Sequence, residues 1–352
     1  MSTGHRRGGR EGDGGGEVQA RALTPAEVRG ALEEGGLAGL SLPTLIALGV
    51  LTPKGGASPS AHRKLKQISH FLQLLAPALA EAFERHEDPI IVDMGAGKAA
   101  ISLALYDVWV RPRGRGRVIA VESREDLAAK VRAVSAAEHP RLEVVCAEIA
   151  HAALPERWHL TLALHACDLA TDHALTRALD AKSDHVALVP CCQAEVARLL
   201  QPVKQSATPL AALWSDPWHR REFGSHLTNV TRALALRALG YAVTVTELTG
   251  WEHSLKNELI LGRRVGRFHR GAREELRALL GQAGVRPWLL GALEERGWGE
   301  EPASPAPAAP AAPAAPADPA DPAAPAAPAD PAAPADPAAP ADPADAPPPS
   351  AP

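Results

Sequence analysis

The sequence is poor in cysteine and has no long apolar run. Its 352 residues include four cysteines, and no pair of them has the spacing of a secreted disulfide scaffold. No apolar stretch reaches the roughly 20 residues that cross a bilayer. The glycine- and charge-rich start of the chain also lacks the apolar core of a signal peptide. We therefore expect a cytoplasmic protein with reduced thiols and no membrane partner.

Large apolar side chains and basic residues are missing from the end of the chain. From Pro302 onward the sequence is almost only alanine, proline and aspartate, with six aspartates and no lysine or arginine. Such a composition cannot bury a core, and its prolines favour an extended backbone. We expect disorder in residues 302–352 and, because of their glycine and charge content, in residues 1–22.

The residues between these ends suffice for one large α/β domain with helical additions. A capping box at residues 24–27, with proline at the first helical position, begins a helix. With a second short helix after Ser41, it predicts a small amino-terminal helical subdomain over residues 23–56. Alternating strands and helices predict the main domain, residues 57–265. Two amphipathic helices predict a carboxyl-terminal helical segment, residues 266–301.

The charge of the chain is close to balanced. The formal net charge is −4, and removing the six aspartates of the tail leaves +2 for the rest. Composition therefore gives no strong case for a nucleic-acid binder. One basic run, residues 111–117, connects the first helix of the predicted sheet to the second strand. We expect it as a solvated loop at the amino ends of the strands.

A strand, a glycine loop and a helix follow one another at residues 90–106. The strand is apolar and β-branched, and it ends near Asp93. Gly95 and Gly97 come next, and the apolar residues after them have helical spacing. Glycines let the backbone turn tightly and approach a ligand without a side chain in the way. Because α/β sheets bind ligands at the carboxyl ends of their strands, the loop predicts a nucleotide site.

Two acidic residues refine the ligand. Glu122 ends the second predicted strand, where a carboxylate can accept both hydrogens of a ribose diol, and Glu148 follows the third strand, where it can meet an adenine amino group. Both suit adenosine, either in S-adenosylmethionine or in NAD. The third position of a G-x-G-x-x-G loop is Ala100, which does not decide between them. Two final strands, residues 241–248 and 258–262, are joined by a short polar segment.

Four segments resemble those of a known family. They are L-H-A-C-D-x-A-T-D-x-A-L at residues 164–175, P-C-C-Q at 190–193, K-x-K-Q-I at 64–68 and a variant of E-H-T-P-K-N at 252–257. Together they resemble S-adenosylmethionine-dependent methyltransferases of the "methyltransferase domain 32" type over roughly residues 60–265. The terminal hairpin is likewise typical of class I methyltransferases rather than dinucleotide dehydrogenases. The chain departs from the family at Ala99-Ala100, where Gly-Tyr is usual, and at Ser254-Leu255, where Thr-Pro is usual.

The resemblance implies an α/β fold with a Rossmann-like class I methyltransferase sheet. The sheet is expected to be mostly parallel with a terminal antiparallel hairpin and to carry amino- and carboxyl-terminal helical additions. The implied cofactor is S-adenosyl-L-methionine, and no metal is expected. The residues expected to bind the cofactor are Asp93, Gly95, Gly97, Glu122, Glu148 and Gln67. For Gln67, which lies on the helix before the glycine loop, a solvated helix face is an equal alternative.

The tip of the fourth predicted strand carries His165, Cys167 and Asp168. In class I methyltransferases the methyl acceptor is held there. Asp168 could accept a hydrogen bond from an acceptor nitrogen or take its proton, and a histidine such as His165 suits a general base near neutral pH. The alternative is that Asp168 caps the next helix and that His165 is a buried structural residue. We expect Thr171 or Asp172 to cap that helix.

Two cysteines, Cys191 and Cys192, lie at the tip of the fifth predicted strand. Four interpretations stay open: packing as small buried groups, positioning of the acceptor, attack of a thiolate on a pyrimidine ring, and a zinc site shared with the fourth strand tip. RNA cytosine-5 methyltransferases have cysteines in this arrangement. Together with Asp168 and His165, the two cysteines are the candidate catalytic residues.

The sequence thus predicts an S-adenosylmethionine-dependent methyltransferase that aligns an acceptor atom with the cofactor's methyl group and excludes water. RNA is the first expectation for the acceptor, and a protein side chain is the second. A predicted loop at residues 214–221, with two tryptophans and two arginines, could stack bases and hold phosphates or anchor a lid. The alternatives are a non-catalytic cofactor- or RNA-binding module on a methyltransferase fold and an NAD-dependent oxidoreductase.

Removal of residues 302–352 tests the expected disorder of the tail. The truncated chain should keep the melting temperature and the S-adenosylhomocysteine affinity of the full chain, because an alanine–proline–aspartate stretch buries no apolar surface. Thermal unfolding with and without the ligand measures both quantities. A lower melting temperature after truncation would contradict the prediction, since it would show that the tail docks on the domain.

Overall fold

The structure, a computed structural model, describes residues 24–164, 166, 168–190, 193–202, 209–248 and 258–298. Both ends that are predicted to be disordered, residues 1–22 and 302–352, lie outside these ranges. Four residues of the predicted acceptor site lie outside them as well: His165, Cys167, Cys191 and Cys192. Within the described ranges, no helix combines the length and the apolar character that crossing a membrane requires.

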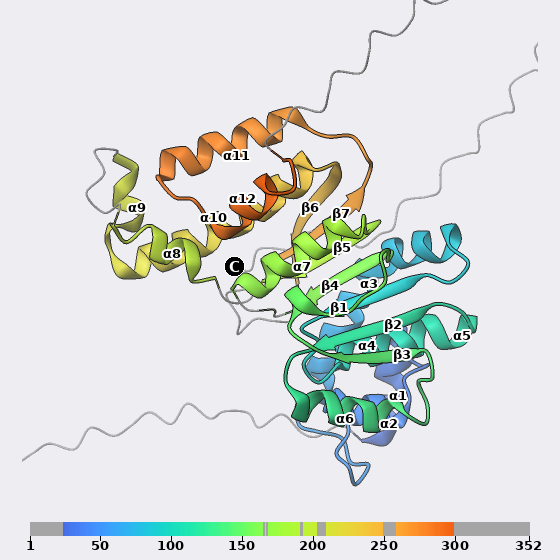
Figure 1. Ribbon diagram of the computed structural model, residues 1–352. Helices are drawn as coiled ribbons and strands as arrows, with labels where there is room; N and C mark the ends of the chain where they lie inside the picture. Colours follow the sequence, from blue (N-terminus) through green and yellow to red (C-terminus); the bar gives the residue numbers. More distant parts are fainter. Residues whose placement is uncertain are drawn as a thin grey trace, which may run out of the picture. The chain divides into compact units, whose positions relative to one another are not determined.

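A seven-stranded sheet runs through the described part of the chain (Figure 1). Its strands are β1 (Ile90–Met94), β2 (Arg117–Glu122), β3 (Leu142–Cys146), β4 (Leu160–Leu164), β5 (His185–Val189), β6 (Tyr241–Glu247) and β7 (Glu258–Arg264). They lie in the order β3-β2-β1-β4-β5-β7-β6. The first five are parallel, and β7 pairs antiparallel with both β5 and β6. The predicted mostly parallel sheet with a terminal antiparallel hairpin is confirmed.

The direction in which the sheet grows reverses at β1. Strands β2 and β3 extend the sheet on one side of β1, and β4 and β5 extend it on the other. The loops after β1 and β4 therefore leave the sheet toward opposite sides. In doubly wound sheets, ligands bind at this reversal, outside the carboxyl ends of the two strands.

Helices cover both faces of the sheet (Figure 1). One core, which includes Leu75 and Leu103, lies under α1 (Pro25–Glu34), α2 (Leu42–Ala47), α3 (Ala61–Arg85), α4 (Ala100–Leu105) and α6 (Glu125–Ser135). The other, which includes Leu175 and Leu236, lies under α7 (Leu169–Asp180), α8 (Glu195–Leu199), α9 (Ala212–Ser215), α10 (Pro217–Ala238), α11 (Arg270–Ala283) and α12 (Trp288–Glu294). The short α5 (Arg111–Arg113) precedes β2. Because parallel sheets are covered on both faces, every residue of β1 is buried.

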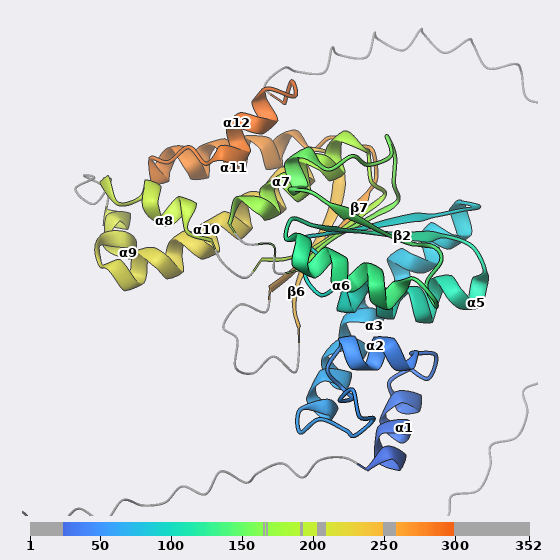
Figure 2. The same cartoon turned by 60° about the horizontal axis from the view of Figure 1, so that its bottom comes forward.

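The two amino-terminal helices form as predicted. Thr24 caps α1 in a capping box: the Glu27 N–H donates to Thr24 Oγ1 at 3.3 Å, and the Thr24 N–H donates to Glu27 Oε2 at 2.6 Å. The Ser41 side chain caps α2. Figure 2 shows both helices beside α3, and their buried side chains belong to the same core cluster as the apolar stripe of α3.

The basic run ahead of β2 is exposed at residues 111–114, as predicted, but Arg111–Arg113 form the short helix α5 and Arg115 is bound to the end of α3. Arg115 donates hydrogen bonds to the carbonyl oxygens of Phe83 at 2.6 Å and of His86 at 2.7 Å. The last carbonyls of a helix have no intrahelical donor, so Arg115 completes the end of α3. The predicted position of the run is confirmed, because β2 begins at Arg117. Helix α3 therefore ends at the amino edge of the sheet.

The prediction of a loop at residues 214–221 is wrong. Trp214 lies in α9, and α10 begins at Pro217, where the Asp216 side chain accepts a hydrogen bond from the Trp218 N–H at 2.9 Å. An aspartate cap followed by proline is a helix start signal. Trp214 is 1% exposed and belongs to the core, whereas Trp218 is 56% exposed.

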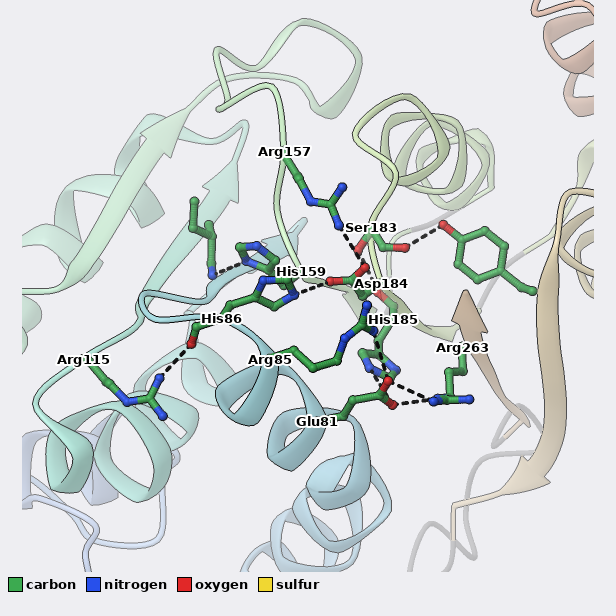
Figure 3. Close-up of polar contacts among 12 residues, drawn as sticks. Glu81, Arg85, His86, Arg115, Arg157, His159, Ser183, Asp184, His185 and Arg263 are labelled. Atoms are coloured by element: carbon green, nitrogen blue, oxygen red, sulfur yellow. Dashed lines mark hydrogen bonds and ion pairs between the residues drawn. The ribbon is translucent and has the colours of Figure 1, made fainter. Parts of the chain in front are cut away.

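A group of titratable side chains lies at the amino ends of the strands (Figure 3). His86 Nε2 bonds to Asp184 Oδ2 at 2.7 Å, and Arg157 donates to the same carboxylate at 3.1 Å. The ring of His159 lies against His86, with centroids 3.8 Å apart, and its Nδ1 accepts the Ile90 N–H at 2.8 Å. Burial, and after it the neighbouring His86, lower the pKa of His159 to about 4.

Acid should destabilise the fold through His159. Its folded pKa of about 4 lies below the ordinary value of 6.5. The unfolded chain therefore binds more protons between these two values, and the free energy of unfolding falls as the pH drops from about 6.5 to about 4. Because the ring is only partly buried, solvent screening reduces the effect, and we expect a loss on the order of 1–2 kcal/mol.

The variant His159→Asn isolates this contribution. Asparagine keeps an oxygen that can accept the Ile90 N–H, but it does not titrate. Urea unfolding at neutral pH and near pH 4.5 measures the free energy of unfolding of both proteins. The variant should lose less stability on acidification than the parent, and equal losses would show that His159 does not cause the acid sensitivity.

Candidate active site

The glycine loop after β1 is tied to the end of β2. The N–H groups of Gly95 and Ala96 donate to the Val121 carbonyl at 2.9 and 2.8 Å. Gly95 and Gly97 have φ values of +77° and +60°, which favour glycine. A Cβ added at Gly97 would meet no other atom within 4 Å. The loop therefore presents open space at this point, as a ligand cradle must.

Glu122 holds the loop from the neighbouring strand. It is 7% exposed, and its Oε2 accepts the Gly97 N–H at 2.8 Å. Its Oε1 accepts from the Arg124 N–H at 3.0 Å and from the Arg124 Nε at 3.2 Å. A carboxylate has about four lone-pair sites. One site is thus unused by these contacts, and a ligand hydroxyl can replace the exposed Arg124 guanidinium at another.

A pocket of about 800 Å³ opens beside the loop. Gly95, Gly97, Glu122 and Glu148 line it, so it brings together four of the predicted cofactor residues. We call it the Glu122 pocket. Glu148 is mostly exposed and pairs with His151 at 3.5 Å. The volume is within the range of small-molecule sites, about 300–1,000 Å³.

A second pocket, of about 290 Å³, adjoins the first. Gln67 and Asp93, the other two predicted cofactor residues, line it together with Lys98. We call it the Gln67 pocket. Ala96 and Leu164 line both pockets, so the pockets meet at the glycine loop and at the tip of β4. All the predicted cofactor residues therefore surround one region at the reversal of the sheet.

Asp93 is the buried acid of this region. It is 3% exposed and accepts a hydrogen bond from Ser102 Oγ at 2.6 Å. Burial raises the pKa of Asp93 to about 6, with a smaller contribution from the charge of Glu122, although the Ser102 hydrogen bond opposes the shift. The carboxylate is poorly solvated, and a cation beside it would stabilise its ionised form.

Asp168 connects the tips of β4 and β5. Its Oδ1 accepts the N–H groups of Ala194 at 3.0 Å and Glu195 at 3.1 Å, and its Oδ2 accepts from Arg198 at 3.0 Å. Asp168 occupies the N-cap position of α7, but its side chain makes no cap bond there and bonds to the start of α8 instead. The alternative that its side chain caps α7 is therefore wrong. Burial alone would raise the pKa of Asp168, but these donors outweigh it and lower the pKa. Asp168 is therefore a weak proton acceptor.

Asp172 forms a buried ion pair, which the sequence does not predict. Arg232 on α10 donates through Nε to Asp172 Oδ1 at 2.7 Å and through Nη2 to Oδ2 at 2.9 Å. Both side chains are at most 3% exposed. The predicted capping role of Thr171 or Asp172 is wrong, because the Thr171 hydroxyl donates to the Ala166 carbonyl at 2.6 Å.

Gln193, the last residue of the P-C-C-Q segment, is held by α10. Its Nε2 donates to Asn229 Oδ1 at 2.8 Å, and its Oε1 accepts from Ser225 Oγ at 2.7 Å. Asn229 in turn donates to Glu258 Oε2 at 2.9 Å. The contacts of Ser225, Asn229 and Arg232 are not predictable from the sequence pattern. Their only signal was a polar side chain inside an apolar helical pattern.

The roles of His165, Cys191 and Cys192 stay predictions, because these residues lie outside the described ranges. The structure does describe the residues next to them in the chain. His165 follows the last residue of β4, which lines both pockets. The two cysteines lie between β5 and Gln193, in the segment that Asp168 and α10 hold at its far end.

One group of described residues has the composition of a metal site. The ligand atoms of His86, His159 and Asp184 lie within 4.8 Å of one another. However, the Nδ1 lone pair of His159 is used by the Ile90 N–H, and Asp184 already binds Arg157. The group also lies at the amino edge of the sheet, away from the two pockets. It therefore takes no part in the site described above.

Comparison with known proteins identifies the domain. Residues 63–199 match the family model of a methyltransferase domain, so the resemblance seen in the sequence motifs is confirmed. A comparison with curated proteins finds no match.

Solved structures give more distant likenesses. The 23S rRNA methyltransferase ErmE is 16% identical, with 64% of this chain and 82% of that chain covered and a TM-score of 0.35. The Podospora anserina methyltransferase PaMTH1, bound to S-adenosylhomocysteine, is 12% identical, with 70% and 99% covered and a TM-score of 0.36. The Methanococcus jannaschii fibrillarin pre-rRNA processing protein is 12% identical, with 51% and 68% covered and a TM-score of 0.32. Likenesses of this size carry no inference about the substrate of this chain.

The family match spans the elements that build the two pockets. It contains the glycine loop after β1, the strands β1 to β5 and the tips that carry Glu122, Glu148 and Asp168. The chain therefore contains a methyltransferase domain, which the family model matches over residues 63–199.

Proposed function

We propose that this methyltransferase uses S-adenosyl-L-methionine to methylate RNA. The observation that carries the proposal is the meeting of the Glu122 pocket and the Gln67 pocket at the glycine loop and the tip of β4. One pocket suits adenosine, and the shared wall ends at Leu164, next to the residues predicted to hold the acceptor. Methyl transfer requires such a layout, because the acceptor atom must lie close to the methyl group and in line with it.

The residues of the two pockets fit the cofactor. Gly97 leaves open space, Glu122 can accept hydrogen bonds from ribose hydroxyls, and Glu148 can accept one from an adenine amino group. Asp93 and Gln67 would face the methionine end, where a poorly solvated carboxylate favours a nearby positive charge. The bound cofactor supplies a methyl group that its positively charged sulfur makes electrophilic.

The loop conformation supports catalysis over a non-catalytic binding module. Ala99 stands where the family has glycine, and it adopts a φ of +50°, which costs an L-residue roughly 1–2 kcal/mol. Nevertheless the Ala99 N–H donates to the Ala96 carbonyl at 2.8 Å, and the cradle at Gly97 stays open. The substitution therefore strains the loop without closing it. The alternative of an NAD-dependent oxidoreductase is not supported, because residues 63–199 match the model of a methyltransferase domain.

Asp168 acts in this proposal as a positioning residue. Its lowered pKa disfavours proton transfer, and its bonds to Ala194 and Arg198 hold the segment after β5 against the tip of β4. Contact with the acceptor falls to the predicted residues His165, Cys191 and Cys192. A histidine at this position could take the proton that the acceptor loses on methylation.

RNA is the proposed acceptor because α10 presents an aromatic side chain with an arginine. Trp218 is 56% exposed, and the Arg221 guanidinium lies 4.6 Å from its ring centroid. Exposed aromatic rings stack on nucleic-acid bases, and arginines contact phosphates and π-faces. An RNA strand could therefore lie across the start of α10, on the side of the sheet that carries the acceptor loops.

The first prediction from this proposed function concerns the cofactor. Glu122→Gln should weaken S-adenosylhomocysteine binding by about 10- to 100-fold, because an amide accepts fewer and weaker hydrogen bonds from ribose hydroxyls than a carboxylate does. Titration calorimetry measures the affinity, and the ligand-induced rise in melting temperature checks it. Glu125→Gln is the matched control, since Glu125 lies on α6, is 68% exposed and does not line either pocket. Equal affinities in the two variants would contradict the assignment, as would a larger thermal shift with NAD.

The second prediction concerns the acceptor and Asp168. Labelled S-adenosylmethionine, incubated with RNA and protein fractions from cells that lack the enzyme, should transfer label to RNA. Asp168→Ala should lower kcat by about 100-fold through misplacement of the loops, while S-adenosylhomocysteine binding survives. Asp168→Asn keeps one acceptor oxygen and should retain part of the activity with an unchanged pH profile.

The contrary outcomes are distinct. Label in the protein fraction alone would replace RNA by a protein acceptor. Loss of all activity in Asp168→Asn, with an intact melting temperature, would assign a proton-transfer role to Asp168. Cys191→Ser and Cys192→Ser should cause only modest losses if the cysteines pack or position. Complete loss together with a trapped RNA adduct would establish the covalent interpretation.

A further inference from the structure

A long stretch around the start of α3 has no negative charge. Between Glu34 and Glu81 the sequence contains no aspartate or glutamate, whereas it contains Lys54, Arg63, Lys64 and Lys66. A strictly one-signed stretch of this length produces a local positive potential that the near-neutral net charge does not reveal.

The fold places the charged start of α3 at the mouth of the pockets. Helix α3 ends at the amino edge of the sheet, where Arg115 binds its last carbonyls. Its first turns therefore lie toward the carboxyl edge, where Lys64 and Gln67 line the Gln67 pocket with Lys98. Arg63, Lys66 and Gln67 fall on neighbouring sides of the helix, because they are spaced three and four residues apart.

Three cations at this edge have no described partner. Arg63, Lys66 and Lys98 are exposed, and none of them forms an ion pair with any residue that the structure describes. Lys64 differs, since its Nζ donates to the Gly49 carbonyl at 2.9 Å. We call Arg63, Lys66 and Lys98 the α3 cationic surface.

At the amino edge of the sheet, by contrast, arginines form ion pairs with carboxylates. There Arg157 pairs with Asp184 at 3.1 Å, Arg263 with Glu81 at 2.6 Å and Arg141 with Asp88 at 3.2 Å. These cations are already neutralised within the chain, so a polyanion gains little by contacting them. The cations of the α3 cationic surface offer their full charge to a ligand.

From this distribution we propose that the α3 cationic surface binds the phosphate backbone of the acceptor RNA and leads the strand along the rim of the Gln67 pocket toward the tip of β4. The inference rests on the proposed function for the identity of the acceptor. Lysine and arginine that contact phosphates supply affinity without reading sequence. Because Lys98 belongs both to this surface and to the pocket, phosphate binding begins outside the pocket and continues to its rim.

RNA binding by the full chain tests the proposal. The chain, saturated with S-adenosylhomocysteine, is titrated into a fluorescent single-stranded RNA of mixed sequence, and anisotropy gives the dissociation constant at several salt concentrations. The double variant Arg63→Gln, Lys66→Gln should raise the dissociation constant roughly tenfold or more near 0.1 M salt. Loss of two phosphate contacts should also reduce the slope of log affinity against log salt by about 1.4.

A matched variant removes the same charge from the other edge. Arg113→Gln with Arg141→Gln changes two exposed arginines that precede β2 and β3. This control should bind RNA like the parent. Both double variants should keep the melting-temperature rise with S-adenosylhomocysteine, because none of the four side chains lines either pocket.

Each contrary result has one meaning. If the parent methylates RNA while the α3 variant binds RNA as tightly as the parent does, the docking surface is wrong and the proposed function stands. If both double variants weaken RNA binding equally, the attraction is only unspecific, and the assignment of the α3 cationic surface as the RNA-binding surface is wrong. Failure of the parent to bind any RNA, with tight binding of a polyglutamate peptide, would overturn the RNA acceptor as well. RNA binding that requires deletion of residues 302–352 would assign the surface to the acidic tail of the chain.

Discussion

The buried ion pair between Asp172 and Arg232 is the contact on which the arrangement of the tips of β4 and β5 depends. Removing two such ions from water costs several kcal/mol for each, and only a nearly complete set of hydrogen bonds offsets this cost. Arg232 binds both oxygens of Asp172, and it also donates to the Asp168 carbonyl at 3.0 Å and to Asn229 at 3.5 Å. Because Asn229 holds Gln193, one guanidinium fixes the segments after β4 and β5 together.

Asp168 also holds the segments after β4 and β5 together. Its carbonyl accepts from Arg232, its carboxylate binds the start of α8, and its backbone adopts a φ of +50°. A non-glycine residue in this conformation persists only when its surroundings hold it there, and such strain is common at functional sites. The H-A-C-D and P-C-C-Q segments therefore carry contacts that define the geometry of the site. A substitution in these segments can therefore change kcat by moving the site residues as well as by removing a reacting group.

Local patterns in the sequence were enough to predict the sheet, the terminal hairpin and the apolar stripe of α3. The six residues predicted to bind the cofactor are all among those that line the two pockets. Five of them are glycines and acids at strand ends, which have a fixed place in such sheets. The sequence did not predict the partners of side chains that are distant in the chain. Arg232 and Asp172 are 60 residues apart, and Arg115 and Phe83 are 32 apart. The helix start at Asp216-Pro217 is a local signal within a segment that was expected to be a loop.

The basic side chains have different roles at the two edges of the sheet. At the amino edge, arginines bind carboxylates and helix carbonyls and so stabilise the fold. At the carboxyl edge, the α3 cationic surface has no ion pair with a described residue. Net charge averages over both edges, whereas a ligand senses charge only within about a Debye length, roughly 8–10 Å. A nearly balanced composition therefore does not argue against a polyanionic substrate. The decisive quantity is the local charge beside the Gln67 pocket, where Lys64 and Lys98 stand against Asp93.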